Sequence, residues 1–161
     1  MPDFFTIRTV TWKNGRVRLI DQSKLPARLS YVECTDYSEV ADAIRNMIVR
    51  GAPAIGVAGA MGMALATMKS EATTKTSLIR DLVRARKILD KTRPTAVNLS
   101  WATHRILDVA RNTDGESRAI VRAVVEEAKL MADQDLEANR TLGKIGAALL
   151  RNGDVVLTHC N

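Results

Sequence analysis

The sequence predicts an α+β fold: a small antiparallel sheet, a bundle of helices, and then the first strand of a second, α/β domain. Short β-type runs flank Asn14-Gly15, a pair that tolerates the positive φ angles of a tight hairpin turn. Apolar residues then recur at helical spacing between residues 36 and 150. A turn at 152–154 precedes the apolar run 155–159, so we expect one domain over residues 1–151 and a buried strand within 152–161.

Three short segments make up the predicted sheet. The hairpin arms are Thr9–Trp12 and Arg16–Ile20, and Tyr31–Cys34 follows the break at Leu25-Pro26 as a third strand. Such a sheet has one apolar face, and we expect Cys34 to lie in or beside it as a small hydrophobe. The sheet is therefore predicted to be scaffold rather than a place of chemistry.

Two helices are expected next. The first opens with the capping box Asp36-Tyr37-Ser38-Glu39, stops at Arg50-Gly51, and presents to the core Val40, Ile44, Met47 and Ile48. The second runs from Pro53 to about Met68 and is built of small and apolar residues, so we expect a buried helix in a cytoplasmic protein with no membrane span. Since each glycine costs about 1 kcal/mol in a helix interior, the repeat Gly56, Gly59, Gly62 predicts close backbone packing.

The remaining helices follow from the same spacing. Ser77 is expected to cap a helix that buries Leu78, Leu82, Ala85, Ile88 and Leu89. A further helix carries Leu99, Ala102, Ile106 and Ala110 on its buried face. A long stretch from Ser117 to about Leu150, with a break expected near 139–141, carries Ile120, Val124, Ala128, Met131, Leu142, Ile145 and Leu149.

Charge and cysteine content restrict the function. The net charge of +6 and pI near 9.7 favour anionic partners. However, the basic residues are scattered among acids, and only 4% of residues are aromatic and could stack on bases. Both observations disfavour a nucleic-acid-binding protein. The two cysteines, Cys34 and Cys160, have no metal-ligand spacing. We therefore expect neither a metal nor an organic cofactor.

Three residues at the junctions of predicted elements are candidates for chemistry. Arg50 precedes a proline-led helix start, where free N–H groups and the helix dipole favour an anion that the guanidinium could clamp. The same spacing also fits a tight helix–helix connection with a solvated arginine. Arg93 stands at a second arginine–proline junction. Cys160 ends the apolar run, as an inert core residue or as a reactive thiol at the carboxyl end of a strand, whereas His104 and His159 are expected to be structural or exposed.

Three longer motifs carry a resemblance to a known family. They are Arg50-Gly51-Ala52-Pro53-Ala54-Ile55-Gly56, Arg93-Pro94-Thr95-Ala96-Val97-Asn98-Leu99 and Thr158-His159-Cys160-Asn161, supported by Thr11-Trp12-Lys13-Asn14-Gly15 and Leu19-Ile20-Asp21-Gln22. Together they resemble the methylthioribose-1-phosphate isomerases over nearly the whole chain. Parts are shared with ribose-1,5-bisphosphate isomerases, and the regulatory subunits of translation initiation factor 2B are more distant relatives.

The resemblance implies an aldose–ketose isomerase of methionine salvage that converts methylthioribose 1-phosphate to methylthioribulose 1-phosphate. It implies that Arg50, Gly51 and Ala52 bind substrate, that Arg93 contributes to the phosphate site, and that Cys160 is catalytic. It also implies that residues 152–161 begin a Rossmann-like domain whose remainder, with a catalytic aspartate, lies beyond this sequence. We therefore expect a chain that is inactive alone and completed by its C-terminal domain or a complementary chain, in an enzyme that is a homodimer when full length. The two alternatives are a ribose-1,5-bisphosphate isomerase and a non-catalytic regulatory subunit.

Overall fold

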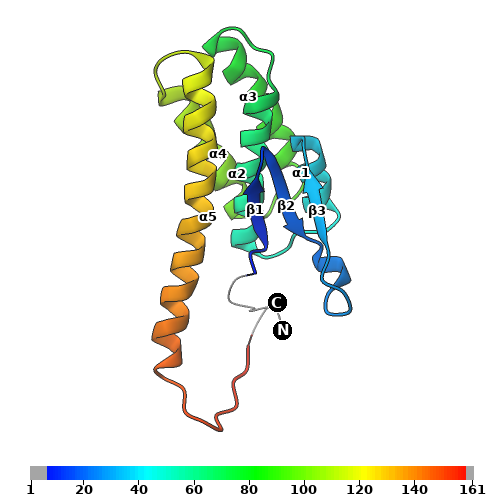
Figure 1. Cartoon of the computed structure of the whole chain (residues 1–161), viewed down its shortest axis with the longest axis vertical. Helices are drawn as coiled ribbons and strands as arrows, with labels where there is room; N and C mark the ends of the chain where they lie inside the picture. The colour runs from blue at the N-terminus through cyan, green and yellow to red at the C-terminus, as the bar shows by residue number, and fades with distance from the viewer. Residues whose placement is uncertain (1–6, 159–161) are drawn as a thin grey trace.

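The computed structural model describes residues 7–158, and it has the predicted α+β architecture: a three-stranded sheet beside five helices (Figure 1). The candidate Cys160 and its neighbours His159 and Asn161 lie outside the described residues. The elements are β1 (Val10–Lys13), β2 (Arg16–Ile20), a short 3-10 turn η2 (Gln22–Lys24), β3 (Tyr31–Cys34), α1 (Tyr37–Arg45), α2 (Ala52–Lys69), α3 (Lys75–Asp90), α4 (Val97–Asn112) and α5 (Ser117–Ala147).

The sheet has the predicted antiparallel order β1-β2-β3. Asn14 and Gly15 both have positive φ, as the hairpin turn requires. Val17 pairs with Trp12 on one side and with Cys34 on the other, which places these side chains on one face of the sheet. Val17 and Cys34 are fully buried, so the predicted position of Cys34 in the sheet as a buried residue is confirmed.

Helix α2 is the centre of the domain, because it packs against all four other helices and against β1 and β2. It has the length and composition of a membrane span, and 72% of that window is buried inside the protein. The core position explains the apolar composition all round the helix.

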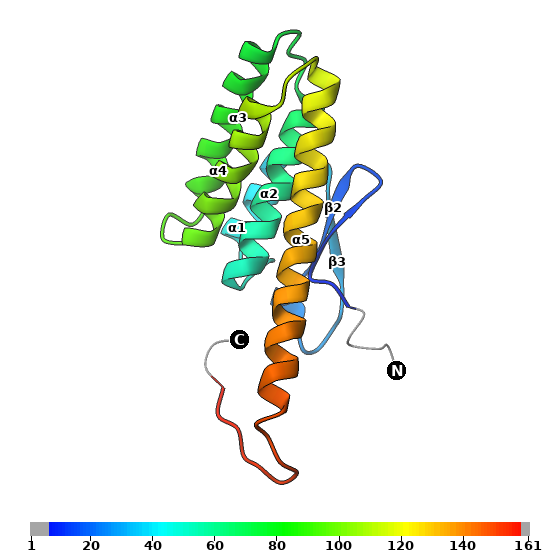
Figure 2. The same ribbon diagram turned by 90° about the vertical axis from the view of Figure 1, so that its left-hand side faces the viewer.

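The glycines of α2 are points of close approach, as predicted. A Cβ at Gly59 would stand 2.4 Å from Cδ1 of Leu99, and a Cβ at Gly56 would stand 3.0 Å from the carbonyl oxygen of Asn98. Both contacts are with the first turn of α4. Figure 2 shows α2 and α4 running side by side in the same direction, while α5 runs the opposite way across them. The starts of α2 and α4 therefore lie together at one end of the bundle.

Three details of the predicted helices differ: the end of α1, the cap of α3 and the burial of Ile88. Helix α1 ends at Arg45, because Met47 adopts a left-handed φ of 57° that turns its side chain outward, where it is 49% exposed. Helix α3 is capped by Thr74, and Ser77 is instead the third helical residue, whose side chain completes the capping box. Ile88 is exposed rather than buried, although the rest of the predicted stripe is in the core.

The C-terminal part differs most from expectation. Helix α5 continues through 139–141 without the expected break, and its C-terminal part projects beyond the bundle (Figures 1 and 2). Leu142, Ile145 and Leu149, expected on the core face, are 70%, 63% and 81% exposed. Residues 155–158 form neither helix nor strand, because a strand needs a hydrogen-bonded neighbour and no described segment pairs with them.

Candidate functional site

The starts of α2 and α4 form a candidate anion site. Neither helix has a side chain that caps its first turn: the residues at the cap positions are Gly51 and Ala96. Pro53 has no N–H and the N–H of Leu99 donates to the carbonyl of Ala96, so the first-turn donors open to a ligand are those of Ala52 and Ala54 in α2 and of Val97 and Asn98 in α4. Both positive dipole ends point the same way. The contact between Gly56 and Asn98 brings the two turns against each other. Two adjacent uncapped helix starts suit a phosphate better than either start alone.

A turn after β2 positions Arg50 in front of α2. The backbone N–H of Gln22 donates to the carbonyl of Ile48 at 2.9 Å, and its side-chain Nε2 donates to the carbonyl of Arg50 at 3.1 Å. Gly51 then takes a φ of 93°, which a side chain would strain, and its carbonyl accepts the first helical hydrogen bond from Ile55. The backbone on both sides of Arg50 is thus fixed.

Asp21 stabilises that turn. Its carboxylate accepts hydrogen bonds from the hydroxyl of Ser23 at 2.5 Å and from the backbone N–H of Ser23 at 3.2 Å, and it pairs with Lys24 at 2.9 Å. These bonds from Ser23 and Lys24 hold the pKa of Asp21 below its usual value. The charged carboxylate therefore supports the segment that carries Gln22.

Arg93 lies in the equivalent place before α4. Helix α3 is closed by the buried Thr92, whose hydroxyl donates to the carbonyl of Leu89 at 2.6 Å. The carbonyl of Arg93 then accepts from the N–H of Ala96 at 2.9 Å, which folds the segment into a turn leading to α4. As the arginine–proline junction predicts, Arg93 stands between the end of one helix and the start of another.

The half-buried arginines of residues 7–158 separate into two groups. Arg86 and Arg105 are in ion pairs with Asp90 and Glu127, and Arg18 lies over the ring of Tyr31. Arg50 and Arg93 have no such partner among the described residues, and the Nε of Arg50 is buried without a hydrogen-bond acceptor. A partly buried guanidinium without a counter-charge is costly to maintain, which favours a ligand as the partner.

Cavities flank the start of α2 on both sides. One of about 280 Å³ lies between α2, α4 and α5, and its walls include Pro53, Gly56, Asn98 and Trp101. Another of about 320 Å³ lies between α2, β1 and α5. Asp135 of α5 lines both. This carboxylate disfavours an anion inside either cavity, so the anion position is at the open end of the bundle, in front of the helix starts.

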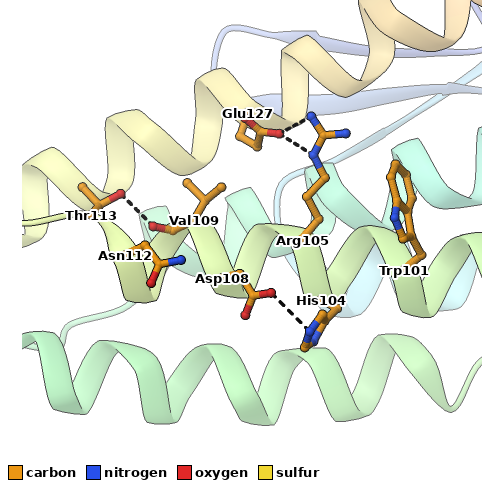
Figure 3. A pocket seen from close by; sticks show the side chains of 8 residues that line it. All are labelled: Trp101, His104, Arg105, Asp108, Val109, Asn112, Thr113 and Glu127. Atoms are coloured by element: carbon orange, nitrogen blue, oxygen red, sulfur yellow. Dashed lines mark hydrogen bonds and ion pairs between the residues drawn. The ribbon is translucent and has the colours of Figure 1, made fainter.

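A third hollow, of about 510 Å³, lies on the outer surface between α4 and α5 (Figure 3). Arg105 points toward Glu127 and pairs with it at 2.5 Å, and Nε2 of His104 lies 3.2 Å from Asp108. The Arg105 charge in this hollow is therefore already satisfied within the protein. His104 is exposed, as predicted.

The thiol at Cys34 is unsuited to catalysis. It is fully buried, and burial together with the nearby Glu39 raises its pKa to about 11. It therefore remains a neutral thiol at physiological pH.

The structure places four of the five predicted site residues at the starts of two neighbouring helices. Arg50, Gly51 and Ala52 lie at the start of α2, and Arg93 lies beside the start of α4. Sequence reasoning missed Gln22, although it lies in the motif at 19–22, because its role depends on a contact 28 residues away along the chain. Within residues 7–158 no group of three or more His, Cys, Asp or Glu is placed to hold a metal ion.

Curated proteins similar to this chain include several that are named methylthioribose-1-phosphate isomerase. The methylthioribose-1-phosphate isomerase of Chloroflexus aurantiacus is 49% identical over 156 residues, which are 96% of this chain and 45% of the relative. The protein of the same name from Geobacter metallireducens is 46% identical over 157 residues, again 45% of its length. The chain therefore spans less than half the length of these curated relatives.

Two solved structures have the same fold. A 5-methylthioribose 1-phosphate isomerase from Pyrococcus horikoshii matches with a TM-score of 0.85 and 44% identity, over 91% of this chain and 41% of that one. A structure titled translation initiation factor eIF-2B, subunit delta, from A. fulgidus matches with a TM-score of 0.87 and 43% identity, over 97% and 45%. The sequence profile of the Initiation factor 2 subunit family matches residues 48–161. By fold, identity and profile, this chain belongs to the Initiation factor 2 subunit family and matches the N-terminal portion of its longer members.

Proposed function

We propose that the chain is the N-terminal half of an aldose–ketose isomerase that converts methylthioribose 1-phosphate to methylthioribulose 1-phosphate in methionine salvage. The observation that carries the proposal is the pair of adjacent, uncapped helix starts. The half-buried Arg50 directly precedes the cap residue of α2, and the half-buried Arg93 lies three residues before the cap residue of α4. The names of the relatives at 44–49% identity support a sugar-phosphate substrate.

In this proposal the helix starts hold the phosphate of the substrate. Arg50 and Arg93 clamp its oxygens, because a guanidinium offers two parallel N–H donors and a permanent charge. The N–H groups of Ala52 and Ala54 add backbone donors from the first turn of α2, where Pro53 has none. Since Asp135 keeps the anion at the open end of the bundle, the sugar extends away from this domain, toward the polypeptide that follows α5.

The chemistry then needs groups beyond the described residues. Phosphorylation of the anomeric oxygen keeps the sugar ring closed, so an acid must assist ring opening before a hydrogen moves from C2 to C1. We propose Cys160 as the catalytic thiol, since Cys34 is buried and its pKa is about 11. We further propose that residues 152–161 begin the second domain, which supplies the acid.

The test is an assay of a full-length chimera. This chain replaces the matching part of the Chloroflexus aurantiacus isomerase, and the product is followed with methylthioribose 1-phosphate and, separately, with ribose 1,5-bisphosphate. We expect turnover of the first sugar phosphate only, and none by a verified 161-residue preparation. A chimera that is folded but turns over neither compound would contradict the proposal.

A regulatory role is the second candidate, and the similarity to the structure titled eIF-2B subunit delta favours it. A regulatory subunit does not need arginines that are free to bind a substrate. Binding of methylthioribose 1-phosphate to the chimera, lost in Arg50→Ala and Arg93→Ala, would favour the isomerase. A folded chimera that binds no sugar phosphate would favour the regulatory role.

A further inference from the structure

The turn that carries Arg93 is closed at its base by a hydrogen bond between two helices. Helices α3 and α4 pack side by side, and residues 91–96 join the end of one to the start of the other (Figure 2). Asp90 is the last residue of α3, and Thr103 lies in the second turn of α4. The hydroxyl of Thr103 donates to Oδ1 of Asp90 at 2.7 Å. The two ends of the segment around Arg93 are therefore tied to each other.

Thr103 is placed so that its hydroxyl faces α3. The residue is fully buried, and a Cβ at Gly59 would stand 3.5 Å from its Cγ2, so its methyl group faces α2. The hydroxyl also lies 3.1 Å from the carbonyl of Ser100, within its own helix. The bond to Asp90 is the shorter of the two, and its acceptor is charged, so it is the stronger bond.

Asp90 is held in turn by its own helix. Its Oδ2 accepts from Nε of Arg86 at 3.1 Å, and a terminal nitrogen of Arg86 lies 3.0 Å from Nδ1 of His104. Two consecutive residues of α4, Thr103 and His104, thus contact an ion pair of α3. These contacts fix the position of Asp90 relative to α4.

The hydrogen bonds inside the turn are local. The N–H of Thr92 donates to the carbonyl of Leu89 at 3.0 Å, and the N–H of Ala96 donates to the carbonyl of Arg93 at 2.9 Å. Bonds of this kind keep the shape of the turn but do not fix its place in front of α4. A site made of the Arg93 guanidinium and the N–H groups that begin α4 needs the two in register to within about 0.5 Å.

We propose that Thr103 and Asp90 are positioning residues of the anion site, whose hydrogen bond holds Arg93 in register with the first turn of α4. Neither residue touches the ligand; both act through the turn that carries Arg93. The kinetic consequence rests on the proposed function, because there the ligand is the phosphate of the sugar. The effect on the turn itself is independent of that function.

Substitutions of Thr103 in the full-length chimera test the positioning role. Thr103→Val keeps the volume of the side chain and removes the hydroxyl. We expect KM for methylthioribose 1-phosphate to rise about fivefold or more with kcat nearly unchanged, because the loss is in phosphate binding. Thr103→Ser loses a buried methyl group but keeps the hydroxyl, so it should keep the KM of the parent. The control is Thr113→Val, which removes a hydroxyl bonded to the carbonyl of Val109 at the other end of α4 and should leave KM unchanged.

Asp90→Ala breaks the same hydrogen bond from the other side. It leaves the hydroxyl of Thr103 with the carbonyl of Ser100 as acceptor, so it tests the link even if Thr103→Val does not fold. The sign of its effect separates positioning from charge. Removal of an acid near a phosphate would by itself strengthen binding, whereas loss of the link should raise KM. A KM equal to or below that of the parent would contradict the proposal.

A double-mutant cycle shows whether Thr103 acts through Arg93. In an Arg93→Ala chimera the turn has no guanidinium to place, so Thr103→Val should change KM by less than about twofold. An increase of the same size in both backgrounds would overturn the positioning role. So would an equal rise in KM in Thr103→Ser and Thr103→Val, because the hydroxyl would then not be what matters.

Amide hydrogen exchange of the 161-residue chain, resolved by NMR, tests the link without any substrate. The N–H groups of Thr92 and Ala96 should exchange about tenfold faster in Thr103→Val than in the parent or in Thr103→Ser, with no matching increase at the buried Val124 of α5. Equal exchange at Thr92 and Ala96, or an equal increase at all three residues, would overturn the proposal.

The two sets of results separate this inference from the proposed function. Turnover by the chimera that is insensitive to Thr103→Val and Asp90→Ala would leave the isomerase standing and refute the positioning role. Faster exchange of the turn in Thr103→Val, with no binding of sugar phosphate by any folded chimera, would refute the isomerase and support the hold on the Arg93 turn.

Discussion

Replacing Gly59 by alanine tests whether the glycines of α2 exist for close packing. The added Cβ would stand 2.4 Å from Cδ1 of Leu99 and 3.5 Å from Cγ2 of Thr103, both on α4. Leu99 is fully buried, so its side chain cannot move aside without displacing other core atoms. Overpacking of this kind costs about 1–3 kcal/mol, and the better helix propensity of alanine returns about 1 kcal/mol.

The net expectation is a loss of up to about 2 kcal/mol in the free energy of unfolding, or a decrease in Tm of up to about 8 °C for a chain of this size. Gly143→Ala is the matched control, because the same substitution in α5 meets no atom within 4 Å. That variant gains propensity without a clash, so we expect it to be more stable by up to about 1 kcal/mol. Thermal unfolding followed by circular dichroism measures both variants.

A second substitution identifies the clash. Leu99→Ala alone should cost about 2–5 kcal/mol by leaving a cavity. In the Gly59→Ala background the new methyl group occupies part of that cavity, so the double variant should be more stable than the sum of the two losses predicts. If Gly59→Ala raises stability as Gly143→Ala does, or if the two losses are additive, close packing is not the reason for the glycine.

Three further outcomes are expected. In the full-length chimera, Arg93→Lys should raise KM for the sugar phosphate about tenfold or more, because lysine cannot bind a phosphate bidentately; Arg80→Lys, at an exposed site on α3, is the control and should leave KM unchanged. Asp36→Ala removes the capping box of α1 and should cost about 1 kcal/mol in urea unfolding, whereas Asp114→Ala, in an exposed turn, should cost little. Burial raises the pKa of Cys34 from 9.0 to about 11, so as the pH rises the Cys34 thiol loses its proton in the unfolded chain before it does so in the folded chain. The free energy of unfolding should therefore fall by about 1.4 kcal/mol per pH unit between pH 9 and pH 11. Comparing Cys34→Ala with the parent at pH 8 and pH 10.5, under reducing conditions, measures this difference, and parallel pH profiles would contradict it.

Local patterns predicted most of the fold. The Asn14-Gly15 turn and the capping box at Asp36 each depend on atoms within a few residues, so the sequence contains what is needed to recognise them. The glycine repeat of α2 is recognised by its spacing, although the atoms that it packs against lie far away along the chain. The end of α1 was predicted too late because Met47 has an apolar side chain at the correct helical spacing. The backbone nevertheless turns left-handed at that residue, and nothing in its side chain signals the turn.

The geometry of the candidate site could be predicted only in part, because it depends on contacts between residues that are far apart in the sequence. Arginine next to a helix start is visible in the sequence, so Arg50 and Arg93 could be named. That the two starts meet depends on Gly56 lying against Asn98, a contact that follows from how two helices pack. The support of Arg50 by Gln22 likewise joins residues that only the folded chain brings together.

The stripe on α5 shows what helical periodicity can and cannot specify. Leu142, Ile145 and Leu149 were expected on a core-facing side, and their spacing does continue the buried face of the helix. Periodicity indicates that a face is to be covered, because bare apolar residues at regular spacing are costly in water. It carries no information on which body does the covering, and in this structure the domain that buries Met131 ends before it reaches Leu142. The prediction therefore identified the apolar face correctly, and its error was to assume that this domain covers the whole of it.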